Sequence, residues 1–214
     1  MKVLVIGGIA GGPSFATRLR RINEDAEIII LERGAAISVA SCALPYYLGG
    51  LIKNRSAVIE RTPEILKQKN NIDVRLFNEV TKINSDAKTV EVHDLQKDET
   101  YTENYDKLII ATGASPTVPE IPGIHDADNA FVLRAVTDAD KIKSFLDTKH
   151  PKHVTVLGAN QSVSKYPRHS LKTTWMLPSS NNQATWLLHL ILRLPTLLAK
   201  SSKSKVSMSS STRA

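Results

Sequence analysis

The chain contains one cysteine, Cys42, within a segment whose residue types suit redox chemistry at sulfur. Cys42 follows Glu32 by ten residues and belongs to the run Ser38-Val39-Ala40-Ser41-Cys42-Ala43-Leu44-Pro45-Tyr46. With a single cysteine the chain cannot form an internal disulfide, so a disulfide formed during turnover must involve a small molecule. A lone cysteine is more often a small buried hydrophobic residue than a nucleophile. The elements before Cys42 favour the nucleophile.

A dinucleotide-binding βαβ unit is predicted in front of this segment. Residues 2–7 form an apolar run typical of a buried parallel strand, and Ala26–Glu32 predicts a second strand of the same kind. A helix from about Gly12 to Ile22 is expected between them, and its apolar face would hold Phe15, Leu19 and Ile22. The predicted order is a strand, a glycine turn, a helix and a second strand that ends in an acidic residue. This order and its length match a dinucleotide-binding βαβ unit of roughly 30 residues.

The glycine turn and the acid indicate which ligand this unit binds. Gly7, Gly8, Ile9, Ala10, Gly11 and Gly12 occupy the place of a GxGxxG loop, with Ile9 where the second glycine normally stands. Such a loop brings a helix N-terminus up to a pyrophosphate. Glu32, twenty residues after Gly12, would accept hydrogen bonds from a ribose. The alternative is an α/β unit with a glycine turn and no nucleotide.

Later segments alternate between helical and strand patterns. Thr62-Pro63-Glu64 predicts an N-cap, an N1 proline and a first-turn acid, opening a helix that ends near Lys69. A capped helix is expected over Thr137–Asp147. The predicted strands are Ile72–Phe77, Val80–Ile83, Thr89–His93, Thr100–Glu103, Lys107–Ala111 and His153–Leu157.

The charge of the chain is unevenly distributed. The formal net charge is +7, but residues 1–160 hold 20 basic and 21 acidic side chains, whereas residues 161–214 hold 8 basic and none acidic. The excess therefore belongs to the tail, so we expect no nucleic-acid partner for the folded part. One cysteine fits a reducing cytoplasm, and the first residues are too short an apolar run for a signal peptide. No membrane span and no metal ligand are predicted.

The glycine loop, Glu32, the Ser38–Tyr46 segment and Tyr105–Gly113 resemble the flavin-dependent pyridine nucleotide–disulfide oxidoreductases. Within that family the likeness is closest to the single-cysteine branch, the coenzyme A–disulfide reductases, and it covers about residues 1–160. The resemblance implies an FAD site in the first nucleotide fold and NADPH or NADH in the second. The FAD contacts that it implies are the glycine loop residues with Glu32, Arg33, Val80, Thr112 and Gly113.

The resemblance also implies how the chain would act on its substrate. Cys42 would be the nucleophile that forms a mixed disulfide with coenzyme A or a related small disulfide. A thiolate is required, and a cysteine beside the flavin or just before a helix suits that need, so we expect a helix directly after Cys42. The substrate contacts implied are Ser14, Arg18, Arg21, Ser38, Ser41 and the neighbourhood of Asn70, where family relatives carry a lysine. Arginines suit the phosphates of coenzyme A, although an ordinary solvated basic face is equally compatible with this spacing.

Two other functions stay open. One is an NADH peroxidase or oxidase, in which the lone cysteine cycles through a sulfenic acid. Such relatives carry a histidine in the glycine loop where this chain has Ala10, which favours the disulfide reductase. The other is a nucleotide-binding module with a basic interaction tail and no enzymatic activity.

The hydrophobic pattern ends near Gln161. We interpret the acid-free remainder as the product of a frameshift near Ser164. Trp175 and Met176 each have a single codon, TGG and ATG. A reading frame that starts at the last base of the Trp175 codon therefore reads GAT, which encodes Asp. The degenerate codons that follow allow a strand ending in an acid, as a second βαβ unit needs. The alternative is a genuine basic, disordered tail. In either case His153–Leu157 would be a lone strand, without a helix to cover its apolar face.

We therefore expect an α/β chain with three parts. Residues 1–112 would form the N-terminal portion of an incomplete, three-layer, Rossmann-like FAD-binding domain. Residues 113–160 would supply a crossover and the first strand of an NAD(P)-binding Rossmann-like fold, and residues 161–214 an aberrant basic tail. Full-length members of the family form homodimers, and this chain would lack the NAD(P) site and dimer interface, so we expect a truncated and inactive form.

Overall fold

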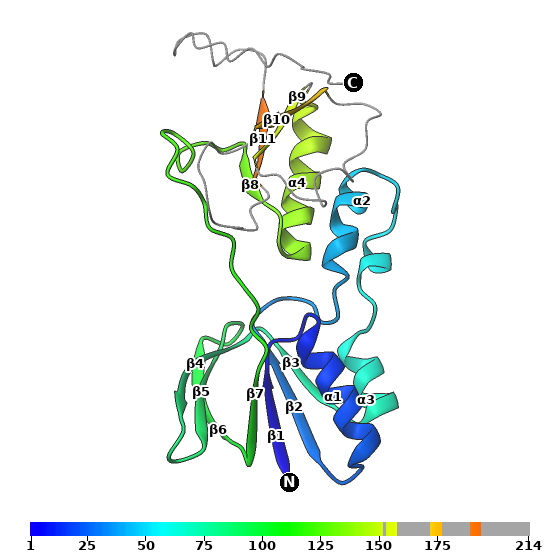
Figure 1. Ribbon diagram of the computed structural model, residues 1–214, viewed down its shortest axis with the longest axis vertical. Helices are drawn as coiled ribbons and strands as arrows, with labels where there is room; N and C mark the ends of the chain where they lie inside the picture. The colour runs from blue at the N-terminus through cyan, green and yellow to red at the C-terminus, as the bar shows by residue number, and fades with distance from the viewer. Residues whose placement is uncertain (152, 158–171, 177–188, 194–214) are drawn as a thin grey trace, which may run out of the picture.

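The computed structural model describes residues 1–151, 153–157, 172–176 and 189–193. The described elements form two lobes, joined by the long connection after β7 and by the chain on either side of α2 (Figure 1). The lower lobe contains both the N-terminus and the parallel sheet. None of the described helices is long and apolar enough to cross a bilayer.

The lower lobe is built on a four-stranded parallel sheet with the strand order β3-β2-β1-β7. β1 (Lys2–Ile6) pairs in parallel with β2 (Glu27–Glu32) on one side and with β7 (Lys107–Ile110) on the other. β3 (Asp73–Leu76) extends the sheet beyond β2. β1 and β2 are apolar and buried over nearly their whole length, as expected for a parallel sheet covered on both faces.

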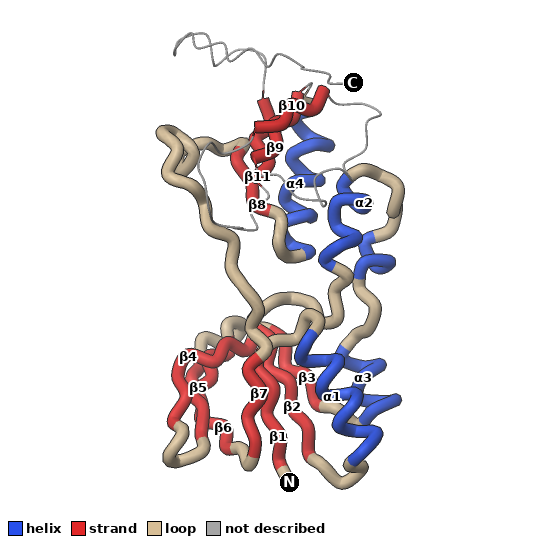
Figure 2. The backbone as a smooth tube through the Cα atoms, in the orientation of Figure 1, coloured by secondary structure: helices blue, strands red, loops and turns tan. Residues whose placement is uncertain are grey.

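Different structures cover the two faces of this sheet. The helices α1 (Gly11–Ile22) and α3 (Pro63–Asn70) cover one face (Figure 2). A three-stranded antiparallel sheet of β4 (Asn78–Asn84), β5 (Thr89–Asp94) and β6 (Glu99–Asn104) covers the other. Alternate residues of β1 and β2 point into the two resulting cores, since successive side chains of a strand point to opposite faces. The predicted α/β class and three-layer, Rossmann-like arrangement are confirmed.

The buried side of α1 differs from the predicted one. The residues that α1 buries are Gly12, Pro13 and Ala16, whereas Phe15 is 36% and Ile22 68% exposed and only Leu19 packs against the core. The reason is the close approach of α1 to β1, which leaves room only for small side chains near the start of the helix. The expectation that Phe15 and Ile22 lie on the buried face is therefore wrong.

The upper lobe contains a second sheet with the strand order β10-β9-β11-β8. β9 (His153–Leu157) pairs in parallel with β10 (Lys172–Met176) and antiparallel with β11 (His189–Arg193), which also pairs with β8 (Ala130–Val132). The expectation of a lone strand is therefore wrong.

The apolar face of β9 is covered by α4 (Val136–Lys149). Val154 and Val156 of β9 share a buried core with Ala139 and Ile142 of α4. The covering helix was expected after the strand, as in a βαβ unit, whereas α4 precedes it in the chain. The strand that the shifted frame would encode after Trp175 lies largely outside the described residues, and the three predicted domain boundaries stay predictions.

The segment that carries Cys42 also packs in the upper lobe. Cys42 lies in a short 3-10 turn, η1 (Ser41–Ala43), which leads into α2 (Leu44–Leu48) and then η2 (Arg55–Val58). The helix predicted after Cys42 is thus present, with five residues. α2 lies beside α4 and away from the parallel sheet (Figure 1).

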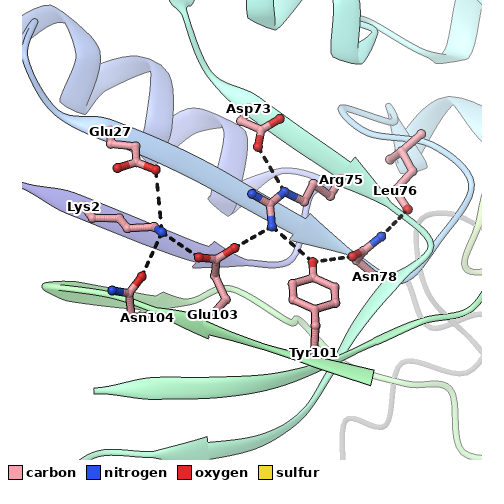
Figure 3. Close-up of polar contacts among 9 residues, drawn as sticks. All are labelled: Lys2, Glu27, Asp73, Arg75, Leu76, Asn78, Tyr101, Glu103 and Asn104. Carbon is pink, nitrogen blue, oxygen red and sulfur yellow. Dashed lines mark hydrogen bonds and ion pairs between the residues drawn. The ribbon is translucent and has the colours of Figure 1, made fainter. Parts of the chain in front are cut away.

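A polar network joins the parallel sheet to the antiparallel one (Figure 3). Glu103 of β6 accepts hydrogen bonds from Lys2 Nζ and Arg75 Nη1, each at 2.6 Å. Arg75 also donates to the Tyr101 hydroxyl at 3.2 Å, and that hydroxyl donates to Asn78 Oδ1 at 2.6 Å. Burial by itself raises the pKa of Glu103, but the hydrogen bonds from Lys2 and Arg75 outweigh it and hold the pKa below its usual value of 4.5. The Glu103 hydrogen bond is also the main reason why the pKa of Lys2 is raised.

This network predicts a pH-dependent contribution of Glu103 to stability. Because its folded-state pKa is depressed, that contribution is present above pH 4.5 and is lost as the pH falls through the folded-state pKa. We expect Glu103→Gln to lower the free energy of unfolding by about 1–2 kcal/mol at pH 7 and by clearly less near pH 4, as measured by urea denaturation. Glu99→Gln, an exposed change on the same strand, should have little effect at either pH. An equal loss for Glu103→Gln at both pH values would contradict the charge-based explanation.

Candidate functional site

The candidate site is a cleft of about 1030 Å³ at the carboxyl ends of β1, β2 and β7. The order of strands along the sheet reverses between β1 and β7, the place where parallel α/β sheets bind ligands. The start of α4 lines the cleft from the other lobe. The sequence-predicted residues that line it are Gly7, Gly8, Ile9, Ala10, Gly11, Ser14, Glu32, Arg33, Ser38, Ser41, Cys42, Val80, Thr112 and Gly113.

Two glycines determine the shape of the loop between β1 and α1. Gly7 has φ +103°, and a Cβ there would lie 2.3 Å from the carbonyl oxygen of Ala111. A Cβ on Gly12 would lie 1.9 Å from the Gly7 carbonyl oxygen. Any larger residue at either position would therefore push the start of α1 away from β1 or from the chain after β7. Gly12 does not line the cleft; it allows Gly11 and Ser14 to do so.

Ile9 stands where a glycine is usual, and the structure shows where its side chain goes. It packs against the upper-lobe core that contains Leu44 and Val136. The substitution therefore adds an apolar contact between the two lobes at the edge of the cleft.

Glu32 ties the glycine loop to the end of β2. The residue is 7% exposed, and its carboxylate accepts 2.6 Å hydrogen bonds from the backbone N–H groups of Gly8 and Gly34. Each carboxylate oxygen has more than one acceptor site, so these bonds leave capacity for a ribose hydroxyl in the cleft. The structure thus places the predicted ribose acid beside the glycine loop.

Cys42 lines the same cleft as Glu32 and is exposed. The chain before it is fixed by Ser38, whose φ of +52° is unusual for a residue with a side chain. The Ser38 N–H donates to the Gly8 carbonyl oxygen at 2.8 Å, and the Glu60 N–H donates to the Ser38 carbonyl oxygen at 2.9 Å. The Cys42 segment is therefore attached directly to the glycine loop.

The predicted substrate residues divide into two groups. Ser14, Ser38 and Ser41 line the cleft, whereas Arg18 and Arg21 lie outside it on exposed turns of α1. Ser14, Arg18 and Arg21 follow one side of α1 over about 10 Å, leading away from the cleft. The structure therefore brings only the first group together with Cys42.

Asn70 lies outside the cleft, at the end of α3 and beside the end of α1. Its carbonyl oxygen accepts a 2.8 Å hydrogen bond from Arg20 Nε, and Arg20 also donates to the carbonyl oxygens of Ala26 and Asn71. Among the described residues, the Asn70 side-chain oxygen has no hydrogen-bond partner. Arg20, which the sequence did not single out, thus connects α1, β2 and α3, while Arg18 and Arg21 are the arginines that face solvent.

The sequence missed the contribution of the segment before α4. Arg134 Nε donates to the Ala114 carbonyl oxygen at 3.1 Å, and the Asp138 carboxylate accepts hydrogen bonds from the N–H groups of Arg134 and Ala135. Asp138 was visible as a first-turn acid of a predicted helix, but nothing local showed that this helix begins at the cleft. The other lining residues that the sequence missed include Glu60, Arg61, Asn78, Glu79, Ser115 and Thr137.

Comparison with known proteins agrees with this geometry. A family model described as pyridine nucleotide-disulphide oxidoreductase matches residues 1–160. The coenzyme A disulfide reductase of Staphylococcus haemolyticus is 37% identical over 158 residues, which are 74% of this chain and 35% of that protein. The chain therefore spans about a third of the length of this curated relative.

Two solved structures share the fold. The reduced Bacillus anthracis CoADR-RHD is 44% identical with a TM-score of 0.79, covering 82% of this chain and 32% of that one. The water-forming NADH oxidase from Lactobacillus brevis, bound to NADH, is 33% identical with a TM-score of 0.74, covering 83% of this chain and 39% of that one. Because the family model matches well over half of its residues, the chain belongs to the pyridine nucleotide-disulphide oxidoreductase family.

Proposed function

We propose that this chain supplies the FAD-binding and disulfide-cleaving part of a coenzyme A disulfide reductase that uses NADPH or NADH. The observation that carries the proposal is the position of Cys42. The only cysteine of the chain lines the same cleft as the glycine loop and Glu32. A thiol, a pyrophosphate-binding loop and a ribose acid around one cleft suit flavin-dependent chemistry at sulfur.

The residues of the cleft fit FAD. The loop from Gly7 to Gly11 presents the N-terminus of the twelve-residue helix α1, which suits a pyrophosphate. Glu32 lies where a ribose would follow, and a volume of about 1030 Å³ is ample for a dinucleotide. Arg33 and Val80 line the Glu32 side of the cleft, and Thr112 and Gly113 line the β7 side.

The proposed reaction begins with the thiolate of Cys42. It attacks one sulfur of the coenzyme A disulfide, forms a mixed disulfide and releases one coenzyme A thiolate. When bound, FAD supplies the two-electron reduction that returns the mixed disulfide to thiols, with NAD(P)H as the electron source. The exposure of Cys42 supports this role, because the Cys42 sulfur must reach the substrate disulfide in line with the S–S bond of the substrate.

Arg18 and Arg21 would bind the phosphates of the coenzyme A part. Both guanidinium groups are exposed, and among the described residues neither takes part in a recorded ion pair. They continue the line that Ser14 begins at the cleft, so a long substrate with its sulfur at Cys42 could reach them. Asn70 ends α3 beside the end of α1, where Arg20 Nε donates to its carbonyl oxygen, and it lies outside the cleft.

A peroxidase or oxidase is the second candidate function, and a specific observation supports it. The Lactobacillus brevis structure, which shares the fold at 33% identity, is a water-forming NADH oxidase. Ala10, which lines the cleft beside the glycine loop, stands where the histidine of such relatives is expected and favours the disulfide reductase. The homodimer implied for full-length members stays a prediction.

Flavin titration tests the cofactor assignment. We expect the purified chain to bind added FAD, and Gly12→Ala to weaken that binding at least about tenfold, because the new Cβ would force α1 away from the loop. Gln68→Ala is the control, since Gln68 is exposed on α3 and lies outside the cleft. Binding is measured by the change in flavin fluorescence. A wild-type chain that binds no FAD would contradict the assignment.

The same sample tests turnover. We expect NADPH not to bleach the flavin of the 214-residue chain, because the family model stops matching at residue 160, at the start of the second nucleotide fold. A nucleotide-binding module would behave in the same way, whereas an active enzyme would bleach. Bleaching under anaerobic conditions would show that residues 161–214 complete an NAD(P) site and would contradict the frameshift interpretation.

Covalent labelling tests the substrate. We expect Cys42 to form its adduct faster with coenzyme A disulfide than with cystine, and Arg18→Ala/Arg21→Ala to slow only the former, by about fivefold for two exposed charges. Intact-mass spectrometry gives both rates, and Cys42→Ser gives the background. Lys82→Ala/Lys97→Ala, which removes two exposed charges on the antiparallel sheet, should change neither. Equal slowing with both reagents would mean that the arginines act on folding, and preferential oxidation by peroxide would favour the second candidate.

A further inference from the structure

The segment that carries Cys42 belongs to the lower lobe by sequence but to the upper lobe by packing. It leaves the lower lobe after β2 and returns before α3, so both of its neighbours cover or form the parallel sheet. Its apolar side chains, however, share one buried core with α4 and β9. The members of that core from the segment are Ala36, Val39, Leu44, Tyr47, Leu48 and Val58, and those from the upper lobe are Val136, Ala139, Ile142, Val154 and Val156.

Residues 40–58 of this segment form a loop whose two ends lie side by side; we call this loop the excursion and its paired ends the base. The Ala40 N–H donates to the Val58 carbonyl oxygen at 2.9 Å, and Val39 forms an antiparallel bridge with Ile59. Ser38 attaches this base to the glycine loop through Gly8. Cys42 lies two residues past the base, so a tilt of the excursion about its base would move the thiol over the cleft.

One ion pair and one apolar contact determine that tilt. Arg55 Nε donates to both carboxylate oxygens of Asp140 of α4, at 3.0 and 2.9 Å, across 85 residues of sequence. Beside this pair, α2 packs on α4, where Ala139 and Ile142 are fully buried. The α2–α4 contact holds the excursion away from its base, and the Arg55–Asp140 pair holds the part of the chain that returns to the base at Val58.

We propose that α4 positions the thiol of Cys42 through its contact with α2 and through the Arg55–Asp140 pair. Arg55 and Asp140 are then positioning residues, and the second lobe orients the nucleophile in addition to any nucleotide that it binds. This inference rests on the proposed role of Cys42 as the nucleophile. It explains why the segment between β2 and α3 of the first lobe is anchored on the second one.

The experiment combines hydrogen exchange with the labelling assay. Arg55→Ala and Asp140→Ala should each raise amide exchange in residues 41–58 by about threefold, as expected for loss of a partly exposed ion pair, and leave residues 11–22 unchanged. The same variants should lower the ratio of the labelling rates for coenzyme A disulfide and cystine by about threefold. The swapped pair Arg55→Asp/Asp140→Arg should restore both values, which a purely structural defect would not do.

Two further variants complete the design. Asp147→Ala removes an exposed charge from the same helix, where its partner is Lys143, and should change nothing. Ala139→Leu overfills the α2–α4 contact and should have a larger effect than the ion-pair variants; if it fails to fold, the ion-pair variants still decide. Unchanged exchange in both single variants overturns the inference, as does raised exchange with an unchanged ratio. A wild-type ratio near one would instead contradict the proposed substrate, and the exchange data would still show whether α4 orders the segment.

Discussion

The whole site depends on how closely the chain approaches itself at Gly7 and Gly12. A Cβ at Gly12 would lie 1.9 Å from the Gly7 carbonyl oxygen, and a Cβ at Gly7 would lie 2.3 Å from that of Ala111. The absence of both side chains allows the end of β1, the start of α1 and the end of β7 to meet at one point. The edge of the sheet becomes a cleft because of this contact, and the N–H groups of the loop and of α1 are left facing it.

The rest of the lower lobe fixes that meeting point. The Glu32 carboxylate bonds to Gly8 and Gly34 and so joins the loop to the end of β2. On the other face, Glu103 bonds to Lys2 and Arg75 and holds the antiparallel sheet against β1 and β3. The two carboxylates are mostly withdrawn from solvent, so each would be costly to leave unpaired. The cleft is therefore supported from both faces of the sheet before the upper lobe contributes anything.

The sequence predicted those parts of the fold that are local. The βαβ unit, the antiparallel strands, the Thr62 N-cap and α4 were all within reach of periodicity and capping, and the cleft does unite Cys42 with Glu32 and the glycine loop. The parts that failed depend on contacts between distant segments. Phe15 and Ile22 form a regular apolar face, yet the glycines bring α1 so near that its small residues face the sheet. β9 is covered by a helix that precedes it and flanked by strands from a region with no readable pattern.

The position of the arginines limits which substrates would use the whole site. Cys42 and Ser14 line the cleft, whereas Arg18 and Arg21 lie one and two turns farther along α1 and outside it. A short disulfide could reach Cys42 without touching either guanidinium. Under the proposed function, only a substrate that carries phosphates at a distance from its disulfide could engage both ends of this line. Coenzyme A disulfide has that form, because an extended arm separates its sulfur from its phosphates. The basic face of α1 and the thiol then act on one molecule, although they do not share one cavity.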